Sequence, residues 1–232
     1  MAEPSDSYTK IFDDPEHAAQ YAGTPAAFMP AYQAMQQMAG VLIREAAPPN
    51  AQVFVHGAGG GSEIEAFART NPDWTFLGVE PAKPMLDEAR KRLGEFSDRV
   101  TLHHGYAEDA PEGPFDAATS LLTLHFLNAA EREKTVSEIV RRLKPGAPFV
   151  AAHCSFPQDP DHRETWLRRH RDFTIASGVD PEIAEKGRQT IANDIEVFDP
   201  ETDEMILRDA GLSDVTLFYS AFTWRGWVGR AM

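Results

Sequence analysis

Short apolar runs alternate with stretches of helical periodicity through the middle of the chain. The apolar runs begin near residues 53, 75, 100, 115 and 147, and glycine, proline or charged residues bound them. Before the last run, Val136, Ile139, Val140 and Leu143 recur at the spacing of an amphipathic helix. Buried parallel strands form continuous apolar runs, and the helices between them complete βαβ units. The pattern therefore predicts an α/β domain.

The first 50 residues precede this pattern, and their spacing predicts helices. Asp13-Asp-Pro-Glu16 has the acids and the early proline of a helix start. A longer helix with an apolar stripe ends at Pro48-Pro49. The stripe consists of Tyr32, Met35, Met38, Ala39, Leu42 and Ile43. We expect residues 1–50 to form a helical lid segment, in which the methionines fill the core rather than contact a ligand.

Residues 155–200 interrupt the alternation of strands and helices. Two helices are predicted, over 163–177 and 181–192, and Gly178 ends the first. The first helix carries four arginines, namely Arg163, Arg168, Arg169 and Arg171. An insertion here lies at the carboxyl end of the sheet, where open α/β folds bind ligands. It predicts a helical cap whose arginines either attract an anionic substrate or form a solvated basic face.

The most informative motif is the glycine-rich loop that follows the first apolar run. Four glycines at positions 57, 59, 60 and 61 separate a strand from a helix start. They let the backbone turn tightly and approach a ligand, while the helix start presents unpaired N–H groups. Glu80 follows the second apolar run, where a carboxylate can accept both ribose hydroxyls. Together these residues predict a nucleoside-binding half-site.

The glycine spacing argues against NAD as the ligand. The dinucleotide fingerprint needs glycines at its first, third and sixth positions. Counted from Gly57 the sixth position is Ser62, and counted from Gly59 it is Ile64. The fit to NAD is therefore poor, although serine can stand in for the last glycine, and the downstream residues decide which adenosine-containing cofactor is expected.

Composition narrows the class of protein further. The chain has 232 residues, a formal net charge of −14 and a single cysteine, Cys154. An acidic surface disfavours direct binding of nucleic acid, and one cysteine forms no internal disulfide. No apolar run approaches the roughly 20 residues of a membrane span, and the polar start lacks a signal-peptide core. We expect a cytoplasmic protein with no membrane partner and a buried Cys154; a homodimer is compatible with the sequence.

The order of these motifs resembles the class I S-adenosylmethionine-dependent methyltransferases. The resemblance covers residues 53–150 and resumes at 207–212, 215–222 and 226–229, which are similar to the last helix and closing hairpin of that fold. It implies a doubly wound, Rossmann-like, seven-stranded sheet with a closing antiparallel hairpin. This domain would span 51–232, with the cap inserted at 155–200. The resemblance also implies S-adenosyl-L-methionine as the cofactor.

The resemblance assigns the cofactor contacts to residues at the ends of the first four predicted strands. Glu80 would take the ribose hydroxyls, and Pro81 and Met85 would flank the adenine. The complete set is His56, Gly57, Ala58, Gly59, Gly61, Glu80, Pro81, Met85, Tyr106, Ala107, Glu108, Leu121 and Leu122. His56 occupies a strand-end position that is usually aliphatic in the family, so a satisfied core histidine is the alternative there.

Catalysis of methyl transfer is expected to depend on few side chains. The reaction is an in-line displacement at an activated carbon, so the protein mainly supplies alignment and a dry pocket. A general base is needed only when the acceptor arrives protonated. His125 is the candidate base, with a structural or wall-lining histidine as the alternative. The spacing of His103, His104 and His153 demands no metal, so we predict no metal site.

Three positions depart from the family pattern. Val55 stands where an acid often holds the amino group of the cofactor. Tyr106 stands where an aspartate often binds the adenine amino group, and Leu121 where a polar residue is frequent. The predicted site is therefore more apolar than is usual in the family.

Within the superfamily, the chain is similar to carboxy-S-adenosylmethionine synthases, which convert S-adenosylmethionine and prephenate into a carboxylated cofactor. Segments 29–33, 122–127 and 222–227 carry this similarity. That family places a basic residue for the new carboxylate where this chain has Met205 and Ile206. We therefore predict a methyltransferase of a small-molecule acceptor. The synthase reaction and a non-catalytic protein that binds a nucleoside or another subunit are the alternatives.

Overall fold

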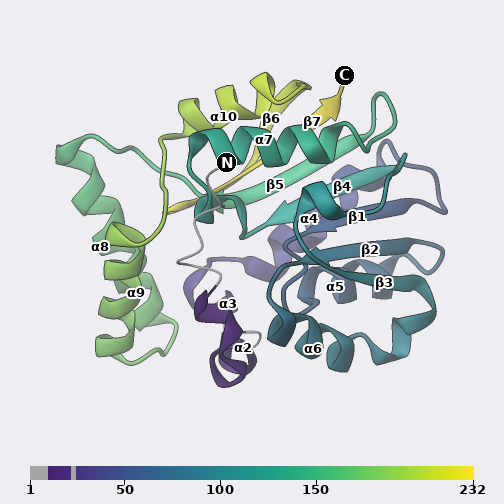
Figure 1. Cartoon of the computed structure of the whole chain (residues 1–232). Coiled ribbons are helices and arrows are strands. Elements are labelled where there is room, and N and C mark those ends of the chain that lie inside the picture. Colours follow the sequence, from purple (N-terminus) through teal and green to yellow (C-terminus); the bar gives the residue numbers. More distant parts are fainter. Residues whose placement is uncertain (1–9, 22–24) are drawn as a thin grey trace.

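The computed structural model describes residues 10–21 and 25–232, and it has an α/β architecture (Figure 1). The strands are β1 (Gln52–His56), β2 (Thr75–Glu80), β3 (Val100–His104), β4 (Ala117–Leu121), β5 (Pro148–Cys154), β6 (Leu212–Ala221) and β7 (Trp224–Ala231). They form a seven-stranded sheet in the order β3-β2-β1-β4-β5-β7-β6. Strands β1 to β5 are parallel, whereas β7 runs antiparallel to β5 and β6. The predicted doubly wound sheet with its antiparallel hairpin is confirmed.

The helices of the described residues follow the predicted order along the chain. The α-helices are α2 (Pro15–Tyr21), α3 (Pro25–Phe28), α4 (Tyr32–Arg44), α5 (Ser62–Thr70), α6 (Lys83–Arg92), α7 (Ala129–Val140), α8 (Pro160–Ala176), α9 (Pro181–Asn193) and α10 (Pro200–Asp209). Short 3-10 helices are η1 (Lys10–Asp13), η2 (Gly94–Arg99), η3 (Ala107–Asp109) and η4 (Leu124–Phe126).

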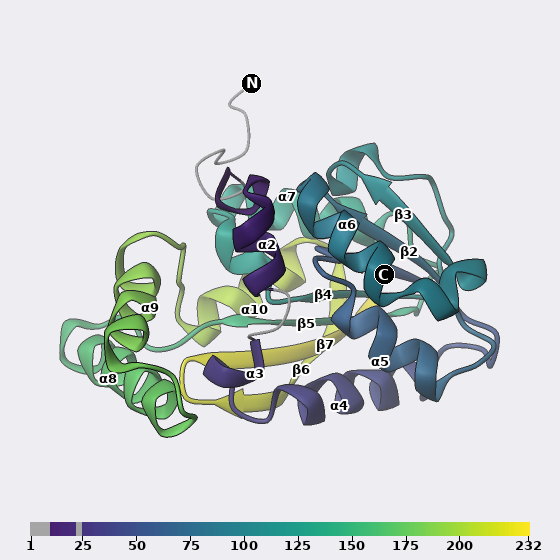
Figure 2. The same ribbon diagram turned by 90° about the horizontal axis from the view of Figure 1, so that it is seen from below.

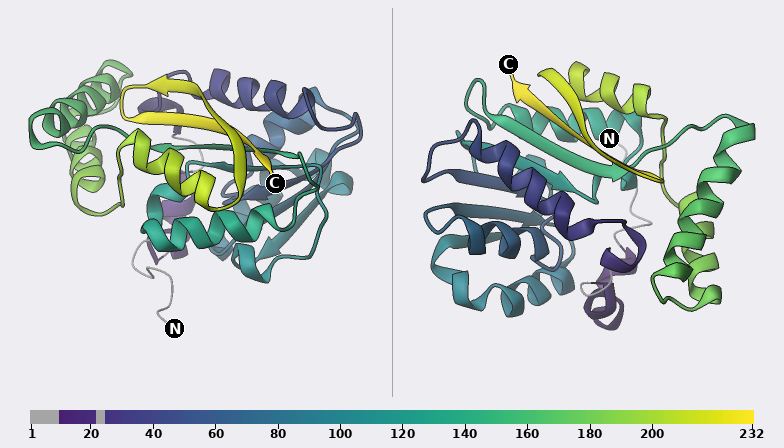
Figure 3. Two further views of the ribbon diagram at one scale, coloured as in Figure 1. Left: turned by 90° about the horizontal axis from the view of Figure 1, so that it is seen from above. Right: turned by 180° about the vertical axis from the view of Figure 1, so that it is seen from behind.

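Helices cover both faces of the sheet (Figures 2 and 3). Successive side chains of a strand point to opposite faces, so β1 contributes to two cores. Val53 and Val55 pack with Phe67 of α5 on the face that α4 and α5 cover. Phe54 packs with Val136 of α7 on the face that α7 and α10 cover. The continuous apolar run in the sequence is the consequence of this double burial.

Two elements are longer than the sequence predicts. Strand β5 continues through His153 and Cys154, beyond residue 150 where the first stretch of the resemblance ends, because β7 pairs with it along its whole length. Both residues are fully buried there. Helix α10 begins at Pro200 rather than near residue 207, because the Asp199 carboxylate accepts a hydrogen bond from the Thr202 amide at 2.8 Å.

The remaining helices gather near the carboxyl ends of the parallel strands. Helices α8 and α9 lie beyond the end of β5, and α2 and α3 lie between them and α6 (Figure 1). Helix α2 packs on α6 and α3 packs on α8. The division into a lid segment at 1–50 and a domain at 51–232 stays a prediction. Within the described residues, no helix is long and apolar enough to cross a bilayer.

Candidate functional site

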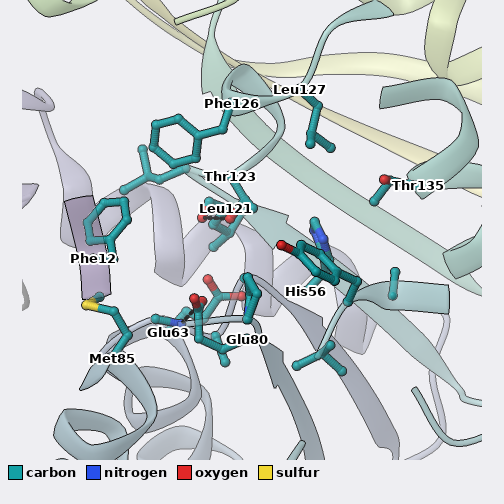
Figure 4. Close-up of a pocket in the computed structure, with 18 of the residues that line it drawn as sticks. Phe12, His56, Glu63, Glu80, Met85, Leu121, Thr123, Phe126, Leu127 and Thr135 are labelled. Atoms are coloured by element: carbon teal, nitrogen blue, oxygen red, sulfur yellow. Dashed lines mark hydrogen bonds between the residues drawn. The ribbon is translucent and has the colours of Figure 1, made fainter. Parts of the chain in front are cut away.

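A cavity of about 170 Å³ opens where strands β1, β2 and β4 end (Figure 4). Its wall contains His56, Gly57, Ala58, Gly59, Glu80, Pro81, Met85, Tyr106, Ala107, Glu108, Leu121 and Leu122. The fold therefore brings together every residue of the predicted cofactor set except Gly61. Gly61 is instead packed against Leu93 of the neighbouring helix end, and a Cβ there would lie 2.9 Å from Leu93 Cδ1.

The glycine loop is held tightly between the ends of β2 and β4. The amides of Gly57 and Ala58 donate to the Val79 carbonyl at 2.9 and 3.0 Å. Gly57 has a φ of +67°, and a Cβ on it would lie 2.1 Å from the Thr123 hydroxyl oxygen. Only glycine fits this turn, because it tolerates positive φ and needs no room for a Cβ.

The carboxylate of Glu80 organises this end of the site. Its Oε2 accepts from the Gly59 amide and its Oε1 from the Ala82 amide, both at 3.0 Å. Each carboxylate oxygen has a second lone pair, so two further donors such as a ribose diol can bind. Burial raises the pKa of Glu80 to about 7, against the lowering effect of the two amides.

A second buried carboxylate, Glu63, also borders the cavity, and sequence reasoning missed it. It lies in the first turn of α5 and is 6% exposed. Its Oε1 accepts from the Thr119 hydroxyl at 2.5 Å, and burial raises its pKa to about 8. An acid in a first helical turn is ordinarily explained by the helix dipole, so the sequence carried no distinctive signal.

Beside Glu63, helix α4 contributes Tyr32 to the wall. The Gln36 side-chain amide donates to the Tyr32 hydroxyl at 2.9 Å and to Ser62 Oγ at 3.3 Å. Burial raises the pKa of Tyr32 to about 12. The structure places Tyr32, a member of the predicted apolar stripe, at the cavity.

Another part of the cavity wall is mostly apolar. Met85 belongs to a small cluster with Phe12 and Ala82, against which Phe126 packs. The rings of Phe12 and Phe126 meet edge to face with centroids 6.1 Å apart. Phe12, Phe126 and Leu127 line the wall but were not among the predicted residues, because no local motif marks an aromatic that closes a distant cavity.

The two histidines of the prediction have different positions. His56 lines the cavity, and its Nδ1 lies 3.0 Å from Ser120 Oγ, while burial lowers its pKa to about 4. His125 is absent from the cavity wall among the described residues. Its Nδ1 accepts from the Cys154 amide at 3.4 Å, its ring contacts Trp224 edge-on, and burial lowers its pKa well below 6.5. The general-base role of His125 stays a prediction, and the contacts favour its structural alternative.

The cap arginines have partners within the cap. Arg163 donates to the Ala192 carbonyl at 2.6 Å, Arg169 stacks over Trp166 at 4.6 Å, and Arg171 pairs with Asp172 at 2.7 Å. Arg168 is exposed. Among the described residues, none from 155–200 lines the cavity. The contacts favour the solvated basic face over an anion site.

Comparison with known proteins agrees with this geometry. Residues 53–146 match the family model described as a methyltransferase domain. This match covers the strands and loops that form the cavity. The chain carries a class I S-adenosylmethionine-dependent methyltransferase domain.

Curated relatives of this methyltransferase-family enzyme are distant. The carboxy-S-adenosyl-L-methionine synthase of Hahella chejuensis is 28% identical over 208 residues, which are 84% of this chain and 82% of the relative. The synthase of Actinobacillus succinogenes is 23% identical over 199 residues, again 84% of this chain and 82% of the relative.

Solved structures share the fold of the enzyme at low identity. An O-methyltransferase family protein from Burkholderia thailandensis superimposes with a TM-score of 0.71 at 17% identity over 100% of this chain. Human N-acetylserotonin methyltransferase, solved with S-adenosylmethionine, superimposes with a TM-score of 0.66 at 13% identity over 99% of this chain. The chain spans 64% and 60% of the lengths of these two proteins, respectively.

Proposed function

We propose that this enzyme binds S-adenosyl-L-methionine in the cavity and transfers its methyl group to a small-molecule acceptor. The observation that carries the proposal is the pairing of Glu80 with the glycine loop. The Gly59 amide orients the Glu80 carboxylate, and both of its oxygens keep acceptor capacity on the cavity wall. This arrangement suits the 2′- and 3′-hydroxyls of a ribose.

Other parts of the wall support an adenosyl ligand. The backbone of the loop from Gly57 to Gly60 borders the cavity without intervening side-chain bulk except the Ala58 methyl. Pro81 and Met85 supply apolar surface beside Glu80, as an adenine ring requires. When bound, the cofactor would supply a methyl carbon activated by a sulfonium. The chain would then bind, align and exclude water.

The wall also favours an apolar acceptor. Leu121, Leu122 and Leu127 border the side of the cavity nearest the end of β4. Apolar side chains place no charge beside the reacting carbon and keep water out. We therefore propose an acceptor with an apolar body and a single nucleophilic group. His125 remains a candidate base only if the loop around it opens.

Binding of S-adenosylhomocysteine, measured by calorimetry, tests the cofactor half of this proposal. We expect micromolar binding by the full chain, weakened at least tenfold by Glu80→Ala, because two hydroxyl hydrogen bonds to a carboxylate are lost. Absence of binding would contradict the proposal and favour a protein without methyl transfer. Formation of S-adenosylhomocysteine from S-adenosylmethionine in the presence of candidate acceptors tests the transfer itself.

A second candidate reaction is carboxy-S-adenosylmethionine synthesis, which the names of the curated relatives favour. The positions that would hold a cation for the new carboxylate are Met205 and Ile206. They lie in α10, with Met205 55% exposed and Ile206 buried, and neither borders the cavity. Incubation with prephenate and S-adenosylmethionine, followed by product mass, separates the two reactions. A mass gain of a carboxyl group on the cofactor would replace methyl transfer as the proposal.

A further inference from the structure

Strand β1 has no acid beside the glycine loop, although the loop would border the charged amino-acid part of the cofactor. Val55 occupies the position in β1 where the family often has this acid, and its side chain is fully buried. In the sheet register it pairs with Thr119 of the adjacent parallel strand β4. Paired residues of neighbouring strands point to the same face, so the side chains of Val55 and Thr119 are neighbours.

Helix α5 brings a carboxylate to this place from another part of the chain. Glu63 Oε1 accepts a hydrogen bond from Thr119 Oγ1 at 2.5 Å. The Glu63 carboxylate therefore lies beside Val55, on the face of the sheet that α5 covers. Glu63 also borders the cavity, together with Glu80 on its floor (Figure 4).

If Glu63 is ionised, its surroundings offer little to stabilise the negative charge. Among the described residues, its hydrogen-bond donor is the neutral Thr119 hydroxyl, and the Glu63 side chain is almost completely buried. Among the described residues, the other titratable groups on the cavity wall are Tyr32, His56, Glu80, Arg92, Tyr106, Glu108, Glu131 and Lys134. Lys134 pairs with Glu108, with Nζ 3.1 Å from Oε1. Arg92 already faces Glu65, with Nε 3.6 Å from Oε2. A buried carboxylate ion is costly unless a cation or several hydrogen-bond donors compensate its charge.

We propose that Glu63 binds the α-ammonium group of the amino-acid part of the cofactor and thereby replaces the acid that is missing at residue 55. This inference rests on the proposed binding of S-adenosylmethionine. It assigns the ammonium subsite to the first turn of α5 rather than to the end of β1. The Thr119 hydroxyl orients the carboxylate and leaves its other oxygen for the ligand.

A pair of ligands isolates this contact. S-adenosylhomocysteine carries the ammonium group, whereas 5′-methylthioadenosine has the same nucleoside thioether without the amino-acid part. We expect Glu63→Gln, which keeps the shape and removes the charge, to weaken S-adenosylhomocysteine binding by roughly 10- to 100-fold. Binding of 5′-methylthioadenosine should change less than about twofold, since neither the ribose nor the base contacts Glu63. Glu95→Gln, at an exposed acid paired with Arg69, is the matched control and should leave both affinities unchanged.

A measurement on the unaltered protein gives a second, independent test. Burial raises the pKa of Glu63 to about 8, so at pH 7 it is mostly protonated without ligand. An ammonium group bound beside it favours the ionised form, so S-adenosylhomocysteine should release more protons than 5′-methylthioadenosine. Calorimetry in buffers of different ionisation enthalpy measures this difference, which Glu63→Gln should abolish.

The outcomes distinguish the two levels of inference. Equal weakening of both ligands by Glu63→Gln, or equal proton release on binding them, overturns the Glu63 assignment while leaving cofactor binding in place. Failure of the unaltered protein to bind either ligand overturns the proposed function itself. Thermal unfolding of each variant verifies that it is folded before its affinity is compared.

Discussion

At the residue scale, the cavity depends on positions that lack a side chain. Gly57 turns the chain at the end of β1, where a Cβ would overlap the Thr123 side chain. Gly187, in helix α9, has nothing within 4 Å of its would-be Cβ and no positive φ. Replacement of glycine by alanine should therefore have opposite effects on the stability of the fold at these two positions.

We predict that Gly57→Ala destabilises the fold by roughly 1–3 kcal/mol, through strained backbone and displacement of Thr123. It should also reduce binding of S-adenosylhomocysteine, because the displaced residues border the cavity. Gly187→Ala should stabilise by roughly 0.5–1 kcal/mol, since alanine loses less entropy in a helix. Urea unfolding measures the stability of both variants. Equal changes in the free energy of unfolding would contradict the claim that position 57 requires glycine.

Two buried carboxyls make the stability of the unliganded protein depend on pH. Burial raises the pKa of Glu63 to about 8 and that of Glu80 to about 7 from the ordinary glutamate value of 4.5. Above about pH 4.5 the unfolded chain has released protons that the folded chain keeps, so the free energy of unfolding falls as pH rises. The fall in the free energy of unfolding that Glu63 causes is complete only above about pH 8, where Glu63 is also ionised in the folded protein.

Glu63→Gln should therefore flatten the stability profile between about pH 5 and pH 8, because the amide does not titrate. The free energy of unfolding, measured by urea titration at several pH values, should decline less steeply in this variant than in the unaltered protein. Parallel profiles would show that Glu63 has an ordinary pKa in the folded state.

At the element scale, one buried arginine connects the loop after β4 to the end of the cap and to α10. Arg132 of α7 donates to the carbonyls of Leu124 at 3.0 Å, Leu127 at 3.2 Å and Glu196 at 2.8 Å. It forms an ion pair with Asp203 of α10, and both side chains are buried. These contacts hold the segment 121–127, of which Leu121, Leu122 and Leu127 border the cavity.

We predict that Arg132→Met destabilises the protein by about 3–5 kcal/mol, because it leaves the Asp203 carboxylate buried without a cation. Adding Asp203→Leu should recover part of this loss, since the unpaired charge is then removed. Denaturant unfolding of the single and double variants provides the measurement. A double variant that is less stable than Arg132→Met would place the main role of Asp203 elsewhere, for example with His153 Nε2 at 3.2 Å.

At the scale of the whole molecule, the cavity is closed by segments that are remote in sequence. The loops after β1 and β2 form its floor, the segment after β4 forms one side, and Phe12 of η1 lies across it against Phe126. Phe12 is 8% exposed, so its ring is a substantial apolar contact. The lid at residues 1–50 stays a prediction, and this contact of Phe12 supports it.

We predict that Phe12→Ala accelerates dissociation of S-adenosylhomocysteine by roughly tenfold, because the wall loses an aromatic ring. Ile183→Ala, at a 60% exposed position of the cap, is the control and should leave dissociation unchanged. Surface plasmon resonance measures both rates. Unaltered dissociation from Phe12→Ala would argue that the amino-terminal segment does not act as a lid.

The sequence by itself determined the local features of this protein. Apolar runs and helical periodicity gave the order of strands and helices, since both patterns depend on neighbours in sequence. Backbone rules for glycine and a carboxylate after the second strand predicted a nucleoside half-site around Gly57 and Glu80, and both residues line the cavity. Boundaries failed where pairing with a distant element decided them, as β7 does when it extends β5 through Cys154.

Tertiary structure alone decided which side chains share the cavity. His125 and Glu63 show this in opposite directions. His125 follows β4 as a catalytic histidine would, yet packing turns its ring toward Trp224 and the Cys154 amide. Glu63 has the sequence context of an ordinary helix-start acid, yet the approach of α5 to β4 carries it to Thr119, beside Val55. Such contacts depend on how helices pack across the sheet, and no pattern of neighbouring residues encodes that geometry.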